Sequence, residues 1–468
     1  MKVYHKIFFQ RIDPLIKVLH RLTTEALLNK ALRNPSSLRP GELSIVFSIY
    51  LASLCSMSET DVEACCGMSK HTALVTYKGA VEHAIAKAQL GDDLAAMQGF
   101  VLYLGINRFA SGSNQDWAHR AWAFTGLACR LASTMSSDAK PPFEQEMQKR
   151  LHLALWYLEH RAREDLGRTV FEPWNMTDDL AILPCTSLPT NARDEDLDPG
   201  MTQPPVPWCG WTEISFSLMQ VEIATATRMV RAATSLTEKL AIIDACESRV
   251  STEYIQFCNG SLAIHWLAKH VAHVLIMELR FQAYGHWPAL SLEDTASWSH
   301  PSYHQQLVHS SQLLLDAVDM LDTERWVQGE PQAAQWGWLM AEFLQFWPLI
   351  FLLGRLSSQP LHEVTLGDRA WQVAERSFRR WERPENKSVG SPYLEALRQL
   401  WSQAHAARMC ALSGASQWSV ADAVSGDFPM FPAVVFASDT LQDRTLQAED
   451  MGFCPSMMSC DLSRAGGM

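Results

Sequence analysis

The sequence lacks several patterns that would point to a function directly. It holds 11 cysteines, but no two of them stand at the Cys-x2-Cys spacing of a zinc finger or zinc knuckle. No apolar run approaches the ~18 residues that a membrane span needs. The first residues, MKVYHKIFFQRIDP, include no small-residue cleavage site of a signal peptide. The sequence therefore argues against a zinc-finger, membrane-spanning or secreted protein, and its scattered cysteines fit a reducing compartment.

Catalytic motifs are missing as well. The chain has no Gly-x-Ser-x-Gly elbow, no P-loop, no Gly-x-Gly-x-x-Gly and no His-Glu-x-x-His. An all-helical biosynthetic enzyme acting on isoprenoid diphosphates would need clustered aspartates for Mg²⁺, and the candidates are Asp92–Asp93 and Asp178–Asp179. Neither pair has a third aspartate at the required spacing. His265, His270 and His273 are interpreted as partly buried or surface histidines, so we expect no enzyme, no cofactor and no metal site.

The net charge argues against a protein that binds DNA by itself. Formal net charge is −12, whereas phosphate binding calls for a basic face. The strongest local patch is a row of arginines at helical spacing, for which we favour a solvated helix face near a helix C-terminus. The row consists of Arg376, Arg379, Arg380 and Arg383.

Apolar residues recur at three- and four-residue spacing along most of the chain, and no period-2 alternation of useful length occurs. This predicts an all-α fold, a single large helical domain of stacked antiparallel helix pairs over residues 1–412. Ser58 and Asp61 mark a helix start, followed by a break at Gly67 or Gly79. Residues 413–468 are predicted to be an irregular, mobile tail. The predicted helices are 42–55, 64–89, 93–110, 115–135, 143–166, 212–233, 236–257, 261–284, 300–324, 332–356, 363–381 and 391–412.

A long acidic, Pro-rich loop interrupts the helices between Gly167 and Gly210. Its prolines and acidic residues cannot sustain a helix. Loops of this length are functional, ordered by packing, or disordered. One interpretation is an ordered surface connection whose aspartates, such as Asp194 or Asp198, cap turns and helix starts. The other is a regulatory surface or part of an effector pocket, with Trp208 and Trp211 anchoring the loop to the core.

Several segments together resemble the regulatory middle homology region of fungal transcription factors. The opening FFQRIDPLIKVLHRLT is similar to the start of that region, through Asp13, Lys17 and His20. FEQEMQKRLHLALWYLEHRAREDLGR resembles its signature helix, and LPTNARDEDLDPGM resembles the acidic segment that follows. The signature positions are Glu146, Arg150, Leu188, Pro189, Asn191, Asp194, Asp196, Leu197, Asp198 and Pro199. CESRVSTEYIQFC resembles a later family segment.

The resemblance implies a nuclear transcription regulator, with regulators of fungal secondary-metabolite clusters as the most similar sub-group. Family members carry a six-cysteine binuclear zinc cluster ahead of this region, and that pattern is absent here. Zinc is therefore expected only in members with the cluster. DNA would be bound indirectly, or through an N-terminal domain that precedes Met1. A homodimer or a heterodimer with a zinc-cluster regulator is implied, and the alternative is a scaffold that modulates a full-length regulator without binding DNA.

Overall fold

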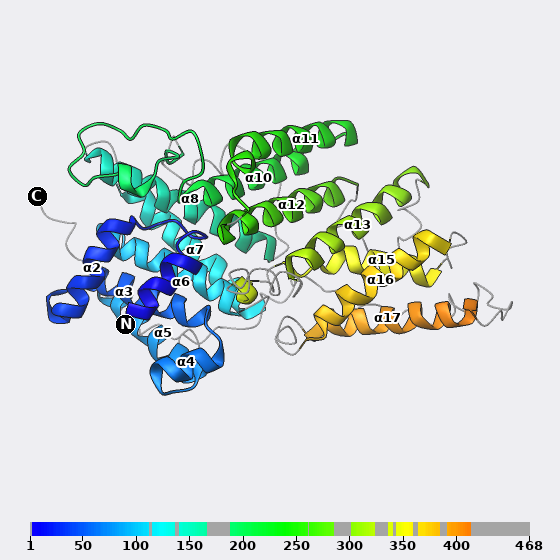
Figure 1. Ribbon diagram of the computed structural model, residues 1–468, viewed down its shortest axis with the longest axis horizontal. Helices are drawn as coiled ribbons and strands as arrows, with labels where there is room; N and C mark the ends of the chain where they lie inside the picture. The colour runs from blue at the N-terminus through cyan, green and yellow to red at the C-terminus, as the bar shows by residue number, and fades with distance from the viewer. Residues whose placement is uncertain are drawn as a thin grey trace, which may run out of the picture. The chain divides into compact units, whose positions relative to one another are not determined.

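A computed structural model describes residues 2–111, 115–135, 140–165, 188–260, 262–284, 301–322, 336–339, 343–358, 364–383 and 391–412. These residues form fifteen α-helices and no strand, as the sequence predicts (Figure 1). The chain divides into two units, Met1–Trp418 and Ser419–Met468, and every described residue belongs to the first. The predicted boundary after residue 412 stays a prediction.

The first half of the described chain holds eight helices packed around one large apolar core. They are α1 (Lys2–Arg11), α2 (Arg21–Arg33), α3 (Pro40–Cys55), α4 (Glu59–Cys66), α5 (Lys70–Lys87), α6 (Leu94–Ser111), α7 (Gln115–Thr134) and α8 (Pro142–Asp165). Helix α3 is buried on almost every side and packs against α1, α5 and α6. Helix α7 packs against α6 and α8.

The second half begins after the acidic loop, which contains a short 3-10 helix, η3 (Asp194–Asp196). It holds α10 (Ser215–Ala232), α11 (Leu236–Glu253), α12 (Ala263–Tyr284), α13 (Pro301–Asp322), α15 (Phe346–Ser358), α16 (Val364–Trp381) and α17 (Ser391–Leu412), with further 3-10 turns η1 (Pro35–Ser37) and η4 (Ile255–Phe257). Helices α10, α11 and α12 pack side by side (Figure 1). A separate apolar cluster joins α13, α15, α16 and α17.

Local capping chemistry explains several helix ends. The Ser58 hydroxyl accepts a hydrogen bond from the Asp61 backbone N at 3.1 Å, which starts α4 as predicted. Gly67 has φ +67° and ends α4, so the break falls at Gly67, while Gly79 lies inside α5. The start of α3 at Pro40 places proline in a first turn, where its missing N–H costs nothing.

One predicted helix is wrong. Residues 332–356 were expected to be continuous, but residues 336–339 form a 3-10 turn and the α-helix begins only at Phe346. Pro348 gives the physical reason, because a proline deep in a helix removes one backbone hydrogen bond and clashes with the preceding turn. The helix therefore starts two residues before Pro348, where the proline lies in the first turn.

Candidate functional site

The acidic loop is tied to α8 through Glu146. This carboxylate is almost fully buried, with Oε1 2.7 Å from the Thr190 backbone N and Oε2 3.3 Å from the Thr190 hydroxyl. Burial raises the pKa of Glu146, and the hydrogen bonds from Thr190 oppose that rise. The first residues of the described loop are thereby fixed against the N-terminal part of α8.

A buried ion cluster lies one turn further along α8. Asp194 Oδ1 accepts a hydrogen bond from Arg150 Nη1 at 2.7 Å, and Asp194 Oδ2 accepts one from Lys17 Nζ at 2.7 Å. The Asp194 side chain is 3% exposed and both cations are 0% exposed. We call Asp13, Lys17, His20, Arg150 and Asp194 the Asp194 cluster. It joins the N-terminal segment, α8 and the acidic loop, which are far apart in sequence.

Asp194 also starts α2. Its Oδ2 accepts a third hydrogen bond, from the Arg21 backbone N at 2.8 Å, at the first residue of that helix. Burial works to raise its pKa, but Lys17 and Arg150 outweigh burial and hold the pKa of Asp194 below its usual range. An ionised carboxylate already saturated by cations and a backbone donor is neither a general base nor a metal ligand. The chemistry of this cluster is attachment, not catalysis.

His20 completes the cluster. Its Nε2–H donates to the Asp194 carbonyl oxygen at 2.8 Å, which leaves Nδ1 to accept from the Thr23 backbone N and cap α2. The imidazole meets the Phe143 ring edge-on, with centroids 5.2 Å apart. Burial lowers the pKa of His20, so the neutral tautomer required by both bonds is favoured.

Asn191 fastens the far end of the loop. Its Nδ2 donates to the Trp208 carbonyl at 3.0 Å and to the Gly210 carbonyl at 2.9 Å. Its Oδ1 accepts from the hydroxyls of Thr212 at 2.6 Å and Ser215 at 3.0 Å. One amide therefore uses all four of its hydrogen-bonding positions to join the loop to the entry of α10.

Replacing Asn191 with aspartate should lower the free energy of unfolding by about 2–3 kcal/mol, because a carboxylate oxygen would then face two carbonyl oxygens that have lost their donor. Urea denaturation followed by tryptophan fluorescence measures this. Asn34→Asp is the matched control. The Asn34 side chain lies at the surface, and its Oδ1 only accepts, from the Ser36 hydroxyl, so a loss below about 0.5 kcal/mol is expected. Equal losses in the two variants would contradict the role given to Asn191.

The titration of Asp13 should make the free energy of unfolding depend on pH. Burial raises the pKa of Asp13 to about 6, despite the Lys17 ammonium 2.7 Å from its Oδ2. A carboxyl whose pKa is higher in the folded state binds more protons when folded, so its contribution to the free energy of unfolding falls as pH rises from about 4 to about 6. The shift of about two units corresponds to a loss on the order of 3 kcal/mol.

Asp13→Asn removes this titration while its amide oxygen can still accept from Lys17. The difference in unfolding free energy, variant minus wild type, should therefore rise between pH 4 and pH 7 by on the order of 3 kcal/mol. Denaturant titrations at several pH values measure it, and titrations shared by both proteins cancel in the difference. A difference that stays flat across this range would show that Asp13 keeps an ordinary pKa.

Some signature residues of the loop are buried and others are exposed. Pro189 and Leu197 are buried, and Leu197 packs with Met147 of α8 in a small apolar cluster. Leu188, Asp196, Asp198 and Pro199 are exposed. Asp198 Oδ1 accepts from the Gly200 backbone N at 2.7 Å, which is turn chemistry. Asp194 does cap a helix start, as one interpretation expected, and its burial between Lys17 and Arg150 is a role that the sequence did not predict.

The two loop tryptophans behave differently. Trp211 packs against the main core and lies 4.8 Å from the His265 ring, centroid to centroid. Trp208 is 46% exposed, with the Arg193 guanidinium 4.2 Å above its ring. Trp211 therefore anchors the loop as predicted, whereas the same prediction is wrong for the Trp208 side chain, which is held at the surface by its backbone bonds.

The Asp and His residues considered as metal ligands in the sequence do not form a metal site in the described part of the chain. Asp93 Oδ1 accepts from the Ala95 backbone N at 3.0 Å at the start of α6. His265 Nδ1 accepts from the Asn259 backbone N at 2.7 Å, and His273 is exposed. Asp178–Asp179 lies outside the described residues. Within the described ranges, no three His, Cys, Asp or Glu side chains gather so that they could hold a metal ion. No described helix is both long and apolar enough to cross a membrane.

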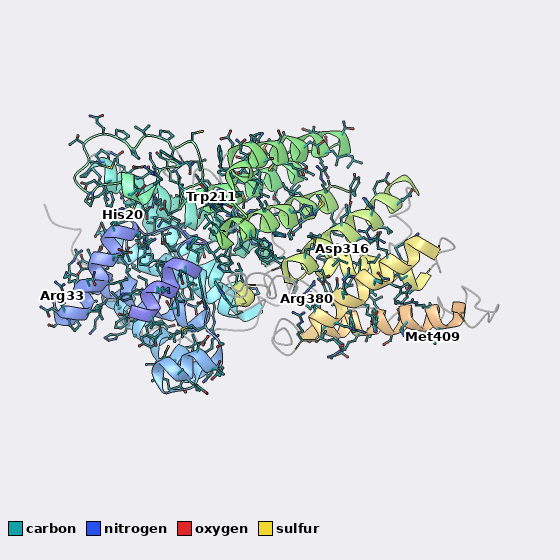
Figure 2. All side chains as sticks on the ribbon, viewed as in Figure 1. His20, Arg33, Trp211, Asp316, Arg380 and Met409 are labelled. Atoms are coloured by element: carbon teal, nitrogen blue, oxygen red, sulfur yellow. The ribbon has the colours of Figure 1, made fainter. Side chains whose placement is uncertain are left out.

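The arginine row on α16 is largely engaged in ion pairs. Arg376 lies 2.7 Å from Asp316 and Arg380 lies 2.6 Å from Asp319, both carboxylates on α13. Asp316 and Arg380 are labelled in Figure 2. Arg380 is only 4% exposed, so the expectation of a solvated helix face is wrong for it. Arg379 remains exposed and pairs with Glu375. Through Arg376 and Arg380 the row joins α16 to α13.

One family model matches part of the chain. Residues 5–205 match the family described as the fungal specific transcription factor domain. The chain is 24% identical over 398 residues to the aurofusarin cluster transcription factor aurR2 of Gibberella zeae, covering 80% of this chain and 55% of that protein. It is 23% identical over 396 residues to the transcriptional regulator AacuB of Aspergillus aculeatus, covering 80% of this chain and 50% of that one.

A third relative is the C6 finger domain transcription factor nscR of Aspergillus fumigatus, 22% identical over 485 residues, covering 98% of this chain and 60% of that protein. The chain thus spans between 50% and 60% of the length of these relatives. No solved structure matches.

Proposed function

We propose that this chain, which carries a fungal specific transcription factor domain at residues 5–205, is a transcription regulator of a fungal secondary-metabolite gene cluster. The observation that carries the proposal is the domain match together with relatives named as cluster transcription factors. The chain acts through a helical regulatory domain over residues 1–412, followed by a tail over residues 413–468. Its place of action is the nucleus.

The contacts of four signature positions support this view of the domain. Glu146, Arg150, Asn191 and Asp194 each form hydrogen bonds that hold the loop, Arg150 through its Nη1. Nothing in this arrangement offers a nucleophile, a general base or a metal ligand. We infer that the signature maintains the shape of a regulatory domain that transmits a signal from an effector or partner.

DNA is reached in one of two ways. In the first, a six-cysteine zinc cluster encoded ahead of Met1 or carried by a dimer partner contacts the major groove. In the second, the chain is a scaffold that binds a full-length zinc-cluster regulator and modulates it. The engagement of Arg376 and Arg380 by carboxylates of α13 supports an indirect route for this part of the protein.

A tethering experiment tests the proposal. The full chain is fused to a heterologous DNA-binding domain and expressed in a fungus with a reporter gene under the matching operator. Reporter transcription should change severalfold, upward or downward, relative to the DNA-binding domain alone. The purified 468-residue chain should not bind cluster promoter DNA in a salt-dependent manner.

The outcomes separate the alternatives. A fusion that is present in the nucleus but leaves the reporter unchanged would overturn the regulatory function. Direct salt-dependent binding of the chain to promoter DNA would overturn the indirect route. Co-purification of a zinc-cluster protein from the native fungus supports the scaffold or the heterodimer, and six cysteines in frame ahead of Met1 support a DNA-binding domain in the same protein. Turnover of an isoprenoid diphosphate with Mg²⁺ would replace the proposal with the enzymatic alternative.

A further inference from the structure

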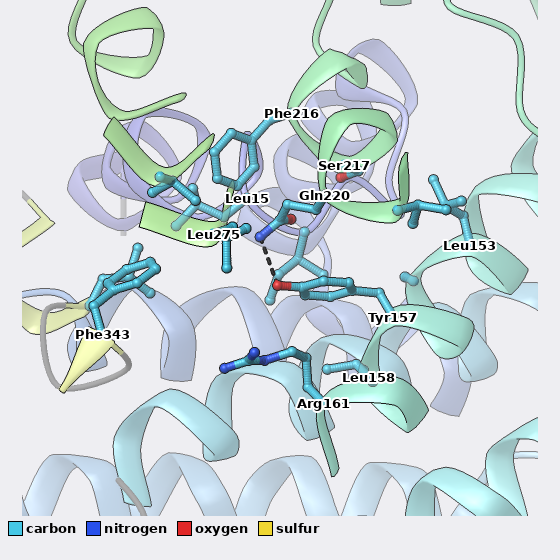
Figure 3. A pocket seen from close by; sticks show the side chains of 15 residues that line it. Leu15, Leu153, Tyr157, Leu158, Arg161, Phe216, Ser217, Gln220, Leu275 and Phe343 are labelled. Carbon is cyan, nitrogen blue, oxygen red and sulfur yellow. Dashed lines mark hydrogen bonds between the residues drawn. The ribbon is translucent and has the colours of Figure 1, made fainter. Parts of the chain in front are cut away.

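A cavity of about 60 Å³ lies between α8, α10 and α12 (Figure 3). A second cavity of about 20 Å³ adjoins it, and Tyr157, Arg161, Gln220 and Leu275 line both. Each helix contributes one stripe of side chains at helical spacing, such as Leu153, Tyr157 and Arg161 on α8. None of the residues in these stripes is a member of the Asp194 cluster. The two cavities are therefore a separate feature of the domain.

The larger cavity is apolar. Its lining includes Leu15 and Ile16 from the segment after α1, Phe216 from α10, Val271 and Leu275 from α12, and Phe343. Leu275 and Phe343 remain partly exposed although they adjoin the main core, because the cavity leaves their surfaces uncovered. A lining of this kind favours an apolar group over ordered water.

The smaller cavity mixes polar and apolar side chains, and its lining carries both signs of charge. Arg161 and His160 of α8 line it together with Glu278 and Gln282 of α12. Gln282 Nε2 donates to Glu278 Oε1 at 3.3 Å. A full negative charge placed here would face Glu278, and a full positive charge would face Arg161. The smaller cavity therefore suits an uncharged group that can donate and accept hydrogen bonds.

A hydrogen bond joins two of the four side chains that line both cavities. Gln220 Nε2 donates to the Tyr157 hydroxyl at 3.0 Å, and the two side chains point at each other across the space in Figure 3. The Gln220 carbonyl oxygen is an acceptor at the same place. An oxygen-bearing group that enters from the apolar side can meet this phenol and this amide, with Arg161 also in the lining of both cavities.

We propose that this pair of cavities binds a small, uncharged molecule with an apolar ring and one hydroxyl or carbonyl group. The ring lies among Phe216, Val271 and Leu275, and the oxygen function lies at the Tyr157–Gln220 pair. The larger volume corresponds to roughly four to six water-sized spheres of about 10–15 Å³ each, which is close to the size of a phenol. Binding follows from the geometry alone, and only its use as a regulatory signal rests on the proposed function.

Three matched probes test the chemistry on the purified full chain. Isothermal calorimetry or ligand-observed NMR compares p-cresol, toluene without the hydroxyl, and benzoate with a full charge. We expect p-cresol to bind in the millimolar range or tighter, and at least fivefold tighter than toluene or benzoate. No p-cresol binding at 10 mM, or benzoate binding as tightly as p-cresol, would overturn the proposal.

Variants then locate the site. Gln220→Leu should reduce p-cresol affinity to that of toluene and leave toluene affinity unchanged, whereas Ser217→Phe, which fills the larger cavity, should abolish binding of both. Gln203→Leu is the matched control on the exposed loop and should bind p-cresol like wild type. Unchanged p-cresol affinity in a folded Gln220→Leu protein would place the site elsewhere.

If circular dichroism shows that Gln220→Leu does not fold, Tyr157→Phe makes the same comparison with the ring retained. These measurements use no reporter gene. A failure of binding is therefore distinguishable from a failure of the proposed transcriptional function.

Discussion

Replacing Asp194 with asparagine is expected to lower the free energy of unfolding by about 3–5 kcal/mol. Asparagine keeps the shape and can still accept hydrogen bonds, but it leaves Lys17 and Arg150 as buried cations whose shared anion is gone. Among the described residues Arg150 Nε and Nη2 have no hydrogen-bond partner, so the link to Asp194 is the strong contact of that guanidinium. A buried charge without a counter-charge is among the costliest features in a protein interior.

The control for this prediction lies two residues away. Asp196 is in the same 3-10 turn, but it is exposed and pairs with Arg193 at the surface. Asp196→Asn should change the unfolding free energy by no more than about 0.5 kcal/mol. Urea denaturation of both variants provides the comparison, and Lys17→Met combined with Asp194→Asn should recover part of the loss. If Asp194→Asn and Asp196→Asn lowered the free energy of unfolding equally, burial of the ion cluster would not be the cause of the effect at position 194.

The second large effect is expected for Gly99→Ala, at the contact between α3 and α6. A Cβ at position 99 would lie 2.1 Å from the Ser44 hydroxyl oxygen and 2.8 Å from the Ser44 backbone carbonyl carbon. The hydroxyl can rotate, but the backbone of the central helix cannot move without disturbing the core around it. Overpacking of this kind costs about 1–3 kcal/mol, and the backbone clash places this variant at the upper end.

Gly79→Ala gives the matched comparison. Gly79 lies within α5, and a methyl group added at its Cα would meet no other atom within 4 Å. Alanine there should therefore stabilise the protein by about 0.5–1 kcal/mol through its higher helix propensity. Thermal unfolding of the two variants should move the midpoints in opposite directions. A Gly99→Ala midpoint equal to or above that of wild type would show that α3 and α6 can separate without cost.

Helices could be predicted from the sequence because their causes are local. Ser58 starts a helix and Gly67 ends one through contacts within a few residues. The failure at residues 332–356 has a local cause as well, since Pro348 stands inside a strongly apolar run whose periodicity alone indicates one long helix. In the structure the α-helix begins at Phe346, which places Pro348 in its first turn.

The ion cluster could not be predicted in this way. Lys17 and Asp194 are 177 positions apart, and no spacing rule connects them. The family resemblance includes the segments of Lys17 and Asp194 but does not link them. Local chemistry predicts only a capping role for Asp194. The cavity was missed for a similar reason, because Tyr157 and Gln220 look like ordinary members of two amphipathic helices until those helices are packed together.

The order of the residues that line the two cavities shows the relative direction of α8, α10 and α12. Along α8, α10 and α12 alike, the larger cavity touches earlier residues and the smaller one later residues, so the three helices run the same way. The chain must therefore travel back along α8 before it can begin α10, a distance of about 36 Å for a helix of 24 residues. About a dozen extended residues would cover that distance.

The connection over positions 166–214 is several times longer than such a crossing needs. The contacts of Glu146, Asn191 and Asp194 determine where the described part of this connection, from residue 188 onward, lies. Insertions in the exposed part should be tolerated, while the three attachment points keep parallel helices in register.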